Sequence, residues 1–221
     1  WLFNLDGTHV QKTVSVSGTY RPVVMDVNGG GIDDIIWYAP GSAPDTMWLF
    51  NPDGTHTSKS VSISGNYVAV PGHFGEPSDD AQPQQRLIWF SATGPDAIWT
   101  FDTNGNHTSK ALPNITGAFK PVVGRFTSTT YDSVLWYRPG SGSEQMWSFT
   151  PSGEVNQLES PVVNGNYDFT VGDFDDNGYQ DIAWASAGKA TIWEFHDGGR
   201  SQVTFNSGTP NTIVRTAYQF L

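Results

Sequence analysis

The stretch Trp48-Leu49-Phe50-Asn51-Pro52-Asp53-Gly54 decides the fold, because it joins a bulky aromatic pattern to a tight turn. The pattern, Trp-x-Phe followed by a turn with Gly, recurs about every 48 residues along the chain. Its copies begin at Trp1, Trp48, Trp99, Trp147 and Trp193. Asn-Pro-Asp-Gly is a hairpin signal, because Gly adopts the positive φ that such turns require. Each repeat is therefore predicted to hold a strand, a hairpin turn and a returning strand.

Two further motifs repeat with the same period. Apolar residues precede a second set of tryptophans, and the two Trp sets together account for all nine tryptophans of the chain: Ile36-Trp37, Ile88-Trp89, Leu135-Trp136 and Ala183-Trp184. In the third motif an aromatic residue or Ile stands seven positions before Phe or Val: Tyr20/Val27, Tyr67/Phe74, Phe119/Phe126, Tyr167/Phe174 and Ile213/Phe220. An apolar run lies between the members of these pairs. Each repeat thus reads as four strands, which we name A to D in chain order.

Four strands in a repeat of about 40–50 residues indicate a β-propeller with radially arranged blades. We predict an all-β propeller of about five four-stranded blades in a single domain, residues 1–221, with repeats at approximately 20–65, 67–117, 119–165 and 167–208. The apolar strand A fits the crowded central axis, and the polar strand D fits the solvated outer edge. Most tryptophans are expected to pack between blades rather than to face a ligand.

The fifth blade is predicted to be composite, made of residues 1–18 and 212–221, so that the two ends of the chain close the ring. This blade has no strand of type B. Either it has three strands, or residues that precede Trp1 are missing from the sequence; the second interpretation is the favoured one. The absence of a Met at position 1 agrees with a processed chain or a piece of a longer one.

Composition narrows the possible partners. The formal net charge of −11 argues against nucleic acids and anionic membranes, since phosphate binding needs a basic surface. No apolar run reaches the roughly 18 residues that a membrane-spanning helix needs. The chain has no cysteine, which excludes disulfides and Cys-ligated zinc. We expect a monomer that neither inserts into membranes nor binds nucleic acid.

The fourth repeat contains Val171-Gly172-Asp173-Phe174-Asp175-Asp176-Asn177-Gly178-Tyr179-Gln180-Asp181-Ile182-Ala183-Trp184, and this pattern resembles the FG-GAP/VCBS repeat family. The resemblance extends over the whole chain at the same period. It implies a secreted, extracellular propeller with calcium in some A–B loops. It also implies a role in adhesion, in glycan recognition or as an appendage of a secreted enzyme. Fungal propeller lectins with related repeats are the nearest functional analogy.

The A–B loop of the fourth repeat places oxygen-bearing residues alternately around a Gly: Asp173, Asp175, Asn177, Gly178 and Asp181. Calcium takes about 6–8 oxygen ligands, and the Gly lets the chain wrap around the ion. The backbone carbonyl of Tyr179 is a further expected ligand. We predict a structural Ca²⁺ at this loop. The alternative is an acidic surface loop capped by its own Asx turns.

The A–B loop of the first repeat aligns with it without gaps, and its expected ligands are Asp26, Asn28, Gly30, the carbonyl of Ile32, and Asp34. This loop keeps only two carboxylates, so a second Ca²⁺ site there should be weaker. His73 and Arg125 stand at the first position in the second and third repeats, where no cage is expected.

The D–A and B–C loops should share one end of the propeller. There the sequence gathers tyrosines beside small hydroxyl and amide residues: Tyr20, Tyr38, Tyr67, Tyr137 and Tyr167. Aromatic surfaces with nearby hydrogen-bonding groups suit sugars, whose C–H faces stack and whose hydroxyls need donors and acceptors. We predict a glycan or glycoprotein ligand on this face. The alternative is that the tyrosines only cap the core and the small residues only make turns.

A catalytic site normally stands out as a constellation that is not repeated, and the sequence shows none. His9, His56 and His107 occupy one repeated position after the C–D turn, which indicates turn chemistry. Asp45, Asp96 and Glu144 each stand three residues before a Trp of strand C, and we expect them to be solvated; none of the common nucleophile, phosphate-loop or zinc motifs occurs. The prediction is a non-catalytic, lectin-like binding module. The alternative is a protein-interaction or spacer domain of a larger secreted or cell-surface protein.

Overall fold

The computed structural model describes residues 2–3, 6–11, 13–75, 84–140, 142, 144–158, 160–187, 189–206 and 214–219. Over these residues the regular structure consists of antiparallel β-strands, as the sequence predicts. Within the same residues there is no helix that is long and apolar enough to cross a membrane.

The strands form four larger sheets, which we call blades 1 to 4, and a separate two-stranded hairpin. Blade 1 holds β3 (Arg21–Met25), β4 (Asp34–Tyr38), β5 (Asp45–Phe50) and β6 (His56–Val61). Blade 2 holds β7 (Val68–Gly72), β8 (Arg86–Phe90), β9 (Ala97–Phe101) and β10 (His107–Ala111). Blade 3 holds β11 (Lys120–Gly124), β12 (Ser133–Tyr137), β13 (Gln145–Phe149) and β14 (Val155–Gln157). Blade 4 holds β15 (Asp168–Gly172), β16 (Asp181–Ser186), β17 (Lys189–His196), β18 (Gly199–Asn206) and β19 (Val214–Gln219).

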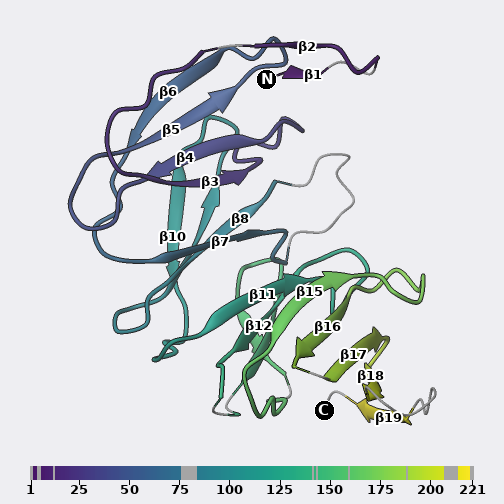
Figure 1. The fold of residues 1–221 in the computed structure, drawn as a ribbon. Coiled ribbons are helices and arrows are strands. Elements are labelled where there is room, and N and C mark those ends of the chain that lie inside the picture. The colour runs from purple at the N-terminus through teal and green to yellow at the C-terminus, as the bar shows by residue number, and fades with distance from the viewer. Residues whose placement is uncertain are drawn as a thin grey trace.

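The blades follow one another along an arc, with the hairpin of β1 (Leu2–Phe3) and β2 (His9–Val10) at one end and blade 4 at the other (Figure 1). In each blade, every strand pairs with its neighbour in the sequence, so the predicted A–B–C–D order is confirmed. The A strands lie on the inside of the arc, because β7 contacts both β3 and β11, and β11 contacts β15. This is a propeller-like arrangement of four blades.

The hydrophobic core is divided among the three junctions between blades. Alternate side chains of β8 serve two junctions, because Leu87 and Trp89 pack toward blade 1 while Ile88 and Phe90 pack toward blade 3. A third cluster joins blades 3 and 4 and contains Trp184. A buried residue of this size contributes about 1.5–3 kcal/mol when it leaves water. Six of the described tryptophans lie in these clusters between blades, as predicted, whereas Trp37 and Trp48 lie in none of them.

Each blade contains the same contact between the Trp of strand B and the Trp of strand C. The pairs are Trp37–Trp48, Trp89–Trp99, Trp136–Trp147 and Trp184–Trp193, with ring centroids 5.2–5.4 Å apart and interplanar angles of 67–72°. In all four, the indole N–H of the strand B residue is buried and has no hydrogen-bond partner among the described residues. Edge-to-face packing lets an N–H point at a ring, which explains why this donor is tolerated.

Three repeated carboxylates correct an expectation, because Asp45, Asp96 and Glu144 are buried rather than solvated. Asp45 accepts the backbone N–H groups of Ala39 and Ile63 at 2.7 Å each. Asp96 accepts those of Ser91 and Ile115, and Glu144 accepts that of Val163. Burial raises the pKa of Asp96 above its ordinary value. These side chains satisfy buried donors of the B–C turn and the D–A segment, a role that makes them structural.

The expected composite fifth blade is not formed by the described residues. Strand β19 pairs with β18, from Val214 opposite Thr204 to Gln219 opposite Gly199, and adds a fifth strand to the outer side of blade 4. Strand β1 pairs with β2, and the two ends of the chain lie at opposite ends of the arc (Figure 1). A hairpin closes a short loop, whereas ring closure joins segments about 200 residues apart at a larger entropic cost. Trp1, Ile213 and Phe220 of the sequence motifs lie outside the described residues.

Candidate functional site

Three equivalent pockets are each lined by one Tyr and two Trp. Two lie at the junctions of blades 1 and 2 and of blades 3 and 4, and the third lies where residues 15–17 meet blade 1. The aromatic triads are Tyr20, Trp37 and Trp48; Tyr67, Trp89 and Trp99; and Tyr167, Trp184 and Trp193. Small polar residues complete the walls: Ser15, Ser17 and Thr46; Ser62, Ser64 and Ser109; and Asn164, Thr191 and Gln202. The sequence motifs therefore meet in space at a place that no single motif indicates.

The Tyr of each triad is held by the turn that precedes strand A. Gly18, Gly65 and Gly165 have φ of +125°, +136° and +129°, and a Cβ there would lie 2.7–3.0 Å from the ring of the Tyr two residues later. Only Gly allows both this backbone and this contact. Each ring also meets the Trp of strand B edge-on, with centroids 6.0 Å apart for Tyr67 and Trp89.

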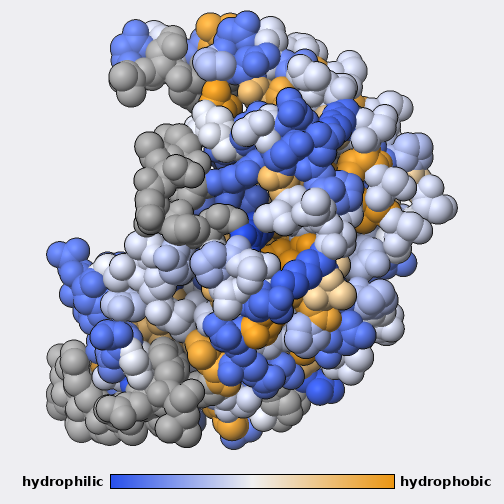
Figure 2. Space-filling view, turned by 180° about the vertical axis from the view of Figure 1, so that it is seen from behind, coloured by the Kyte–Doolittle hydropathy of each residue, from blue (hydrophilic) through white to orange (hydrophobic). Residues whose placement is uncertain are grey.

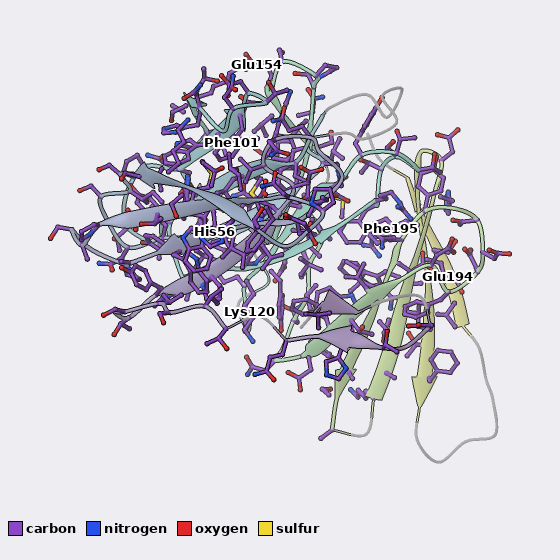
Figure 3. All side chains as sticks on the ribbon, turned by 90° about the horizontal axis from the view of Figure 1, so that it is seen from above. His56, Phe101, Lys120, Glu154, Glu194 and Phe195 are labelled. Carbon is purple, nitrogen blue, oxygen red and sulfur yellow. The ribbon has the colours of Figure 1, made fainter. Side chains whose placement is uncertain are left out.

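The Trp of strand C is supported from the adjacent strand D. His56 stacks on Trp48 at 4.1 Å and His107 stacks on Trp99 at 3.7 Å. In blade 4 the guanidinium of Arg200 takes this place, 4.0 Å from the Trp193 ring. Figure 3 labels His56 in β6 of blade 1 and Phe195, two residues after Trp193, in β17 of blade 4. All three histidines of the repeated position, His9, His56 and His107, start a strand, and His56 and His107 pack on tryptophan, which fits a structural role.

Two of the five tyrosines predicted to face the ligand are instead inside the protein. Tyr38 and Tyr137 are buried, with 1% and 0% of their surface exposed. Their hydroxyls donate to the carbonyls of Gly65 and Gly165 and accept the N–H groups of Tyr67 and Tyr167. Because each joins strand B of one blade to the D–A corner of the next, neither can offer a ring face to a ligand. For these two residues, the alternative that they cap the core is correct.

The junction between blades 2 and 3 differs from these three places. Phe119 replaces the Tyr and is buried, so the hydroxyl is lost. Gln145 accepts a hydrogen bond from the indole of Trp147 at 3.2 Å. The guanidinium of Arg138 lies 5.7 Å from the Phe119 ring. This junction keeps the Trp pair and a side-chain amide but has no tyrosine hydroxyl at this position.

The walls of the three pockets hold no charged side chain. They offer aromatic surface together with hydroxyl and amide groups, which suits an uncharged ligand with both apolar and polar faces. The side of the molecule in Figure 2 is largely hydrophilic, with small hydrophobic groups between the polar ones. The walls of the three pockets are therefore polar and uncharged.

At the opposite end of the blades, the A–B loop of blade 4 brings three carboxylates together. Oxygens of Asp173, Asp175 and Asp181 lie within 4.8 Å of one another. Asp181 is fully buried and accepts the N–H groups of Phe174 and Phe195, both at 2.8 Å. Burial, and secondarily repulsion from Asp175 and Asp173, raises the pKa of Asp181 to about 6. A divalent cation would offset both effects, since it stabilises the charged form.

The remaining predicted ligands of this loop lie close to the cluster. The Asn177 amide donates to Asp175 and to the carbonyl of Phe195, and its oxygen accepts the N–H of Tyr179. Asp173 accepts the N–H groups of Asn177 and Gly178. Three carboxylates and an amide oxygen are the donor set that Ca²⁺ prefers, so the residues fit the ion.

The loop of blade 1 uses the same backbone with fewer charges. Asp26 accepts the N–H groups of Gly29, Gly30 and Gly31 at 2.7–3.1 Å, and Asn28 accepts a second contact from Gly30. Asp34 accepts the N–H groups of Val27 and Phe50, and burial raises its pKa above the ordinary value. Ile32 lines an apolar recess on blade 1. The carboxylate of Asp26 is therefore hydrogen-bonded by three backbone amides.

Sequence reasoning missed a repeated contact between blades, which we call the latch. A side chain directly before strand B accepts the backbone N–H of the first A–B loop residue in the preceding blade. Gln85 binds Asp26 at 2.9 Å, Asp132 binds His73 at 2.8 Å and Gln180 binds Arg125 at 3.0 Å. The backbone N–H of each acceptor residue donates in return to the carbonyl of the same partner. The only signal in the sequence is an amide or carboxylate at this one position of the repeat.

Searches for similar proteins found no matching family model and no matching curated protein. The resemblance to FG-GAP/VCBS repeats thus stays a prediction from the residues.

Proposed function

We propose that this protein is a non-catalytic carbohydrate-binding propeller that holds neutral glycans in the pockets at its blade junctions. The observation that carries the proposal is the threefold occurrence of one pocket, with Tyr20, Tyr67 and Tyr167 in equivalent places. A general requirement of the core would be met in the same way in all four blades. The tyrosine is present in three of them and is replaced by Phe119 in blade 3, which favours a role beyond core packing.

The chemistry of the pockets matches that of a sugar. The C–H faces of a pyranose ring stack on Tyr and Trp, while serine, threonine and amide groups pair with its hydroxyls. The neutral walls disfavour sugars with carboxylate or sulfate groups, because nothing in them would compensate a buried charge. Several weak sites on one rigid arc would add avidity toward a branched or repeated glycan.

The proposal includes a structural Ca²⁺ at the Asp173 loop and a weaker second one at the Asp26 loop. The carboxylates of the first loop would hold the ion, and bound calcium would supply charge compensation that fixes the loop between strands A and B. It also includes a secreted, FG-GAP/VCBS-type propeller with five blades, acting outside the cell.

A glycan array with neutral and acidic glycans, followed by calorimetry on the neutral hits, tests the proposal. We expect neutral glycans to bind, and Tyr20→Ala, Tyr67→Ala and Tyr167→Ala each to remove one site from the stoichiometry. Tyr131→Ala is the matched control, because Tyr131 is a half-buried tyrosine in an A–B loop. An array without neutral hits on a protein with an intact melt would exclude the carbohydrate function and leave the interaction or spacer domain.

A further inference from the structure

A pocket of about 290 Å³, which we call the inner pocket, opens on the inside of the arc between the A strands of blades 1 and 2. Strand β3 contributes Arg21 and three apolar residues to its walls, and β7 contributes Val68, Ala69 and Pro71. It is distinct from the three pockets of the proposed function, although Tyr67 borders both the inner pocket and one of those three.

The inner pocket carries one charged group at its edge. Among the described residues that line it, Arg21 is the only charged one, and it is exposed. Its guanidinium donates to the carbonyl of Tyr67 at 3.5 Å, the long end of the hydrogen-bond range, and the described part of the chain supplies it with no carboxylate. A guanidinium has five N–H donors in a planar fork that matches the two oxygens of a carboxylate. The edge of the pocket therefore suits an anionic group.

The equivalent junction, between blades 3 and 4, shows which group fills this space. Ala69 stands opposite Trp89 in blade 2, as Phe169 stands opposite Trp184 in blade 4. The ring of Phe169 packs edge-on against Tyr137, with centroids 6.3 Å apart and an interplanar angle of 89°, and lies 5.8 Å from the Trp184 ring. The later junction is thus filled by an aromatic side chain where the earlier one has a methyl group.

The aromatic residues that surround this ring have the same arrangement in both junctions. Tyr38 meets Trp89 with centroids 5.1 Å apart at 61°, and Tyr137 meets Trp184 at 5.0 Å and 64°. The Tyr38 hydroxyl makes two hydrogen bonds to the D–A corner of blade 2, which fix this wall. The junction of blades 1 and 2 therefore keeps the surroundings of an aromatic ring but not the ring itself.

The remaining walls exclude a second site for sugars. Val23, Val24 and Pro71 have no polar side-chain atom, whereas the other three pockets offer hydroxyl and amide groups. A sugar in the inner pocket would leave its hydroxyls without partners, which costs free energy. An apolar ring with one anionic substituent has no such cost.

We propose that the inner pocket binds a small molecule that carries an aromatic ring and a carboxylate. The ring takes the place that Phe169 has in blade 4, beside Tyr38, and the carboxylate pairs with the guanidinium of Arg21. The volume lies near the lower end of the roughly 300–1,000 Å³ of small-molecule sites, which limits the ligand to one ring system. The inference is independent of the carbohydrate function.

An NMR titration of the isotope-labelled protein with 3-phenylpropionate, and with its neutral amide as the matched ligand, tests the proposal. We expect the acid to bind with a Kd of about 1 mM or lower, and the amide to bind about tenfold more weakly, because it lacks the charge-assisted hydrogen bonds to Arg21. Arg21→Gln should weaken binding of the acid by about the same factor and leave binding of the amide unchanged.

Lys120→Gln is the matched control variant, because Lys120 starts β11 as Arg21 starts β3, at the junction where Phe169 fills the space. This variant should bind the acid as the unmodified protein does. Ala69→Phe gives blade 2 the residue type of Phe169 and should abolish binding. A thermal melt checks the fold of every variant, and if Ala69→Phe does not fold, Arg21→Gln decides the test.

Three results would overturn the proposal: no binding of the acid, equal binding of acid and amide, or an equal loss of affinity in Lys120→Gln and Arg21→Gln. Unchanged binding by a folded Ala69→Phe would overturn it as well, because the ligand would then lie elsewhere. The tripeptide glycyl-glycyl-phenylalanine presents the same ring and carboxylate at a peptide end. If it binds more weakly than 3-phenylpropionate, the small-molecule assignment is supported, and tighter binding would overturn that assignment in favour of a peptide C-terminus.

Discussion

The A–B loops of blades 1 and 4 have the same backbone and different charge. In both, the residues three and five positions after the first Asp have positive φ: Gly29 and Gly31 in one, Asp176 and Gly178 in the other. In both, the final Asp accepts two buried N–H groups. The comparison teaches that one loop backbone occurs twice, and that the two copies differ in the number of carboxylates that they bring together.

The two loops differ in the burial of the first Asp and in the number of backbone N–H groups that it accepts. Asp26 is buried and receives three glycine N–H groups, whereas Asp173 is exposed, receives two, and has Asp175 beside it. Successive glycine amides form a concave site for an anion, which here is the Asp26 carboxylate itself. In blade 1 the charge of the first Asp is thus stabilised by backbone N–H groups, whereas in blade 4 our proposal assigns this role to Ca²⁺.

The largest expected effect tests what the two loops share. Asp34→Ala and Asp181→Ala each leave two backbone N–H groups without an acceptor, and we expect each to lower the free energy of unfolding by about 2–4 kcal/mol in EDTA. Asp34→Ala should cost more, because its removal relieves repulsion from one carboxylate, Asp26, whereas removing Asp181 relieves repulsion from two, Asp173 and Asp175. Urea unfolding measures both. A loss below about 1 kcal/mol in both variants would show that these N–H groups find other partners.

The second prediction removes the extra carboxylate that distinguishes the blade 4 loop from the blade 1 loop. Asp175→Asn gives the blade 4 loop the residue type of Asn28 and should abolish most of the calcium-dependent stabilisation, which amounts to about 2.7 kcal/mol at a Ca²⁺ concentration 100 times Kd. In EDTA the same change should slightly raise the Tm, since a repulsive charge is gone. Thermal melts with Ca²⁺ and with EDTA test both signs.

Asp176→Asn is the control for the second prediction. It removes a charge from the same loop at a residue outside the carboxylate cluster, and Asn tolerates its φ of 60°. If this control loses the calcium response as fully as Asp175→Asn, the response comes from net charge and not from the cluster.

The third prediction transfers the site to blade 1. Asn28→Asp with Gly30→Asn reproduces the charge pattern of blade 4, and calorimetry should show one additional or strengthened Ca²⁺ site worth about 1 kcal/mol of stabilisation. Gly30 does not have positive φ, so the backbone accepts a side chain, although residue 28 must turn because its Oδ1 lies 2.8 Å from the new Cβ position. An unchanged stoichiometry and affinity would mean that the three amides on Asp26 exclude the ion.

The smallest expected effect is on pH dependence. The pKa of Asp181 is raised to about 6 in the folded protein, so between pH 5 and 7 the folded state binds more protons than the unfolded state. Stability without calcium should therefore fall by about 1 kcal/mol as pH rises through this range. With calcium the trend should largely disappear, because the ion competes with the proton and brings the folded-state pKa of Asp181 back toward its unfolded value. A calcium response that is equal at pH 5 and pH 7 would contradict this assignment.

Much of the fold could be read from the sequence, because the period of the Trp motifs is a property of neighbouring residues. Trp48 and Phe50 specify a strand, and the Asn-Pro-Asp-Gly turn specifies the hairpin that follows it. Strand order, blade boundaries and the carboxylate loop at Asp173 follow from the same local pattern. Tyr20, Tyr67 and Tyr167 were predicted as ligand residues, and the structure places them in pockets.

Tertiary contacts decided the rest. Tyr38 and Tyr137 look like Tyr67 in the sequence, yet they are buried because the next blade supplies partners for their hydroxyls. The burial of Asp45 and the latch at Gln85 likewise depend on residues 18 and 59 positions away. The sequence alone determined which strands form, since strand and turn propensities act over a few residues. Only the packing of one blade on the next decided which polar groups are buried, because burial depends on residues that are distant in the chain.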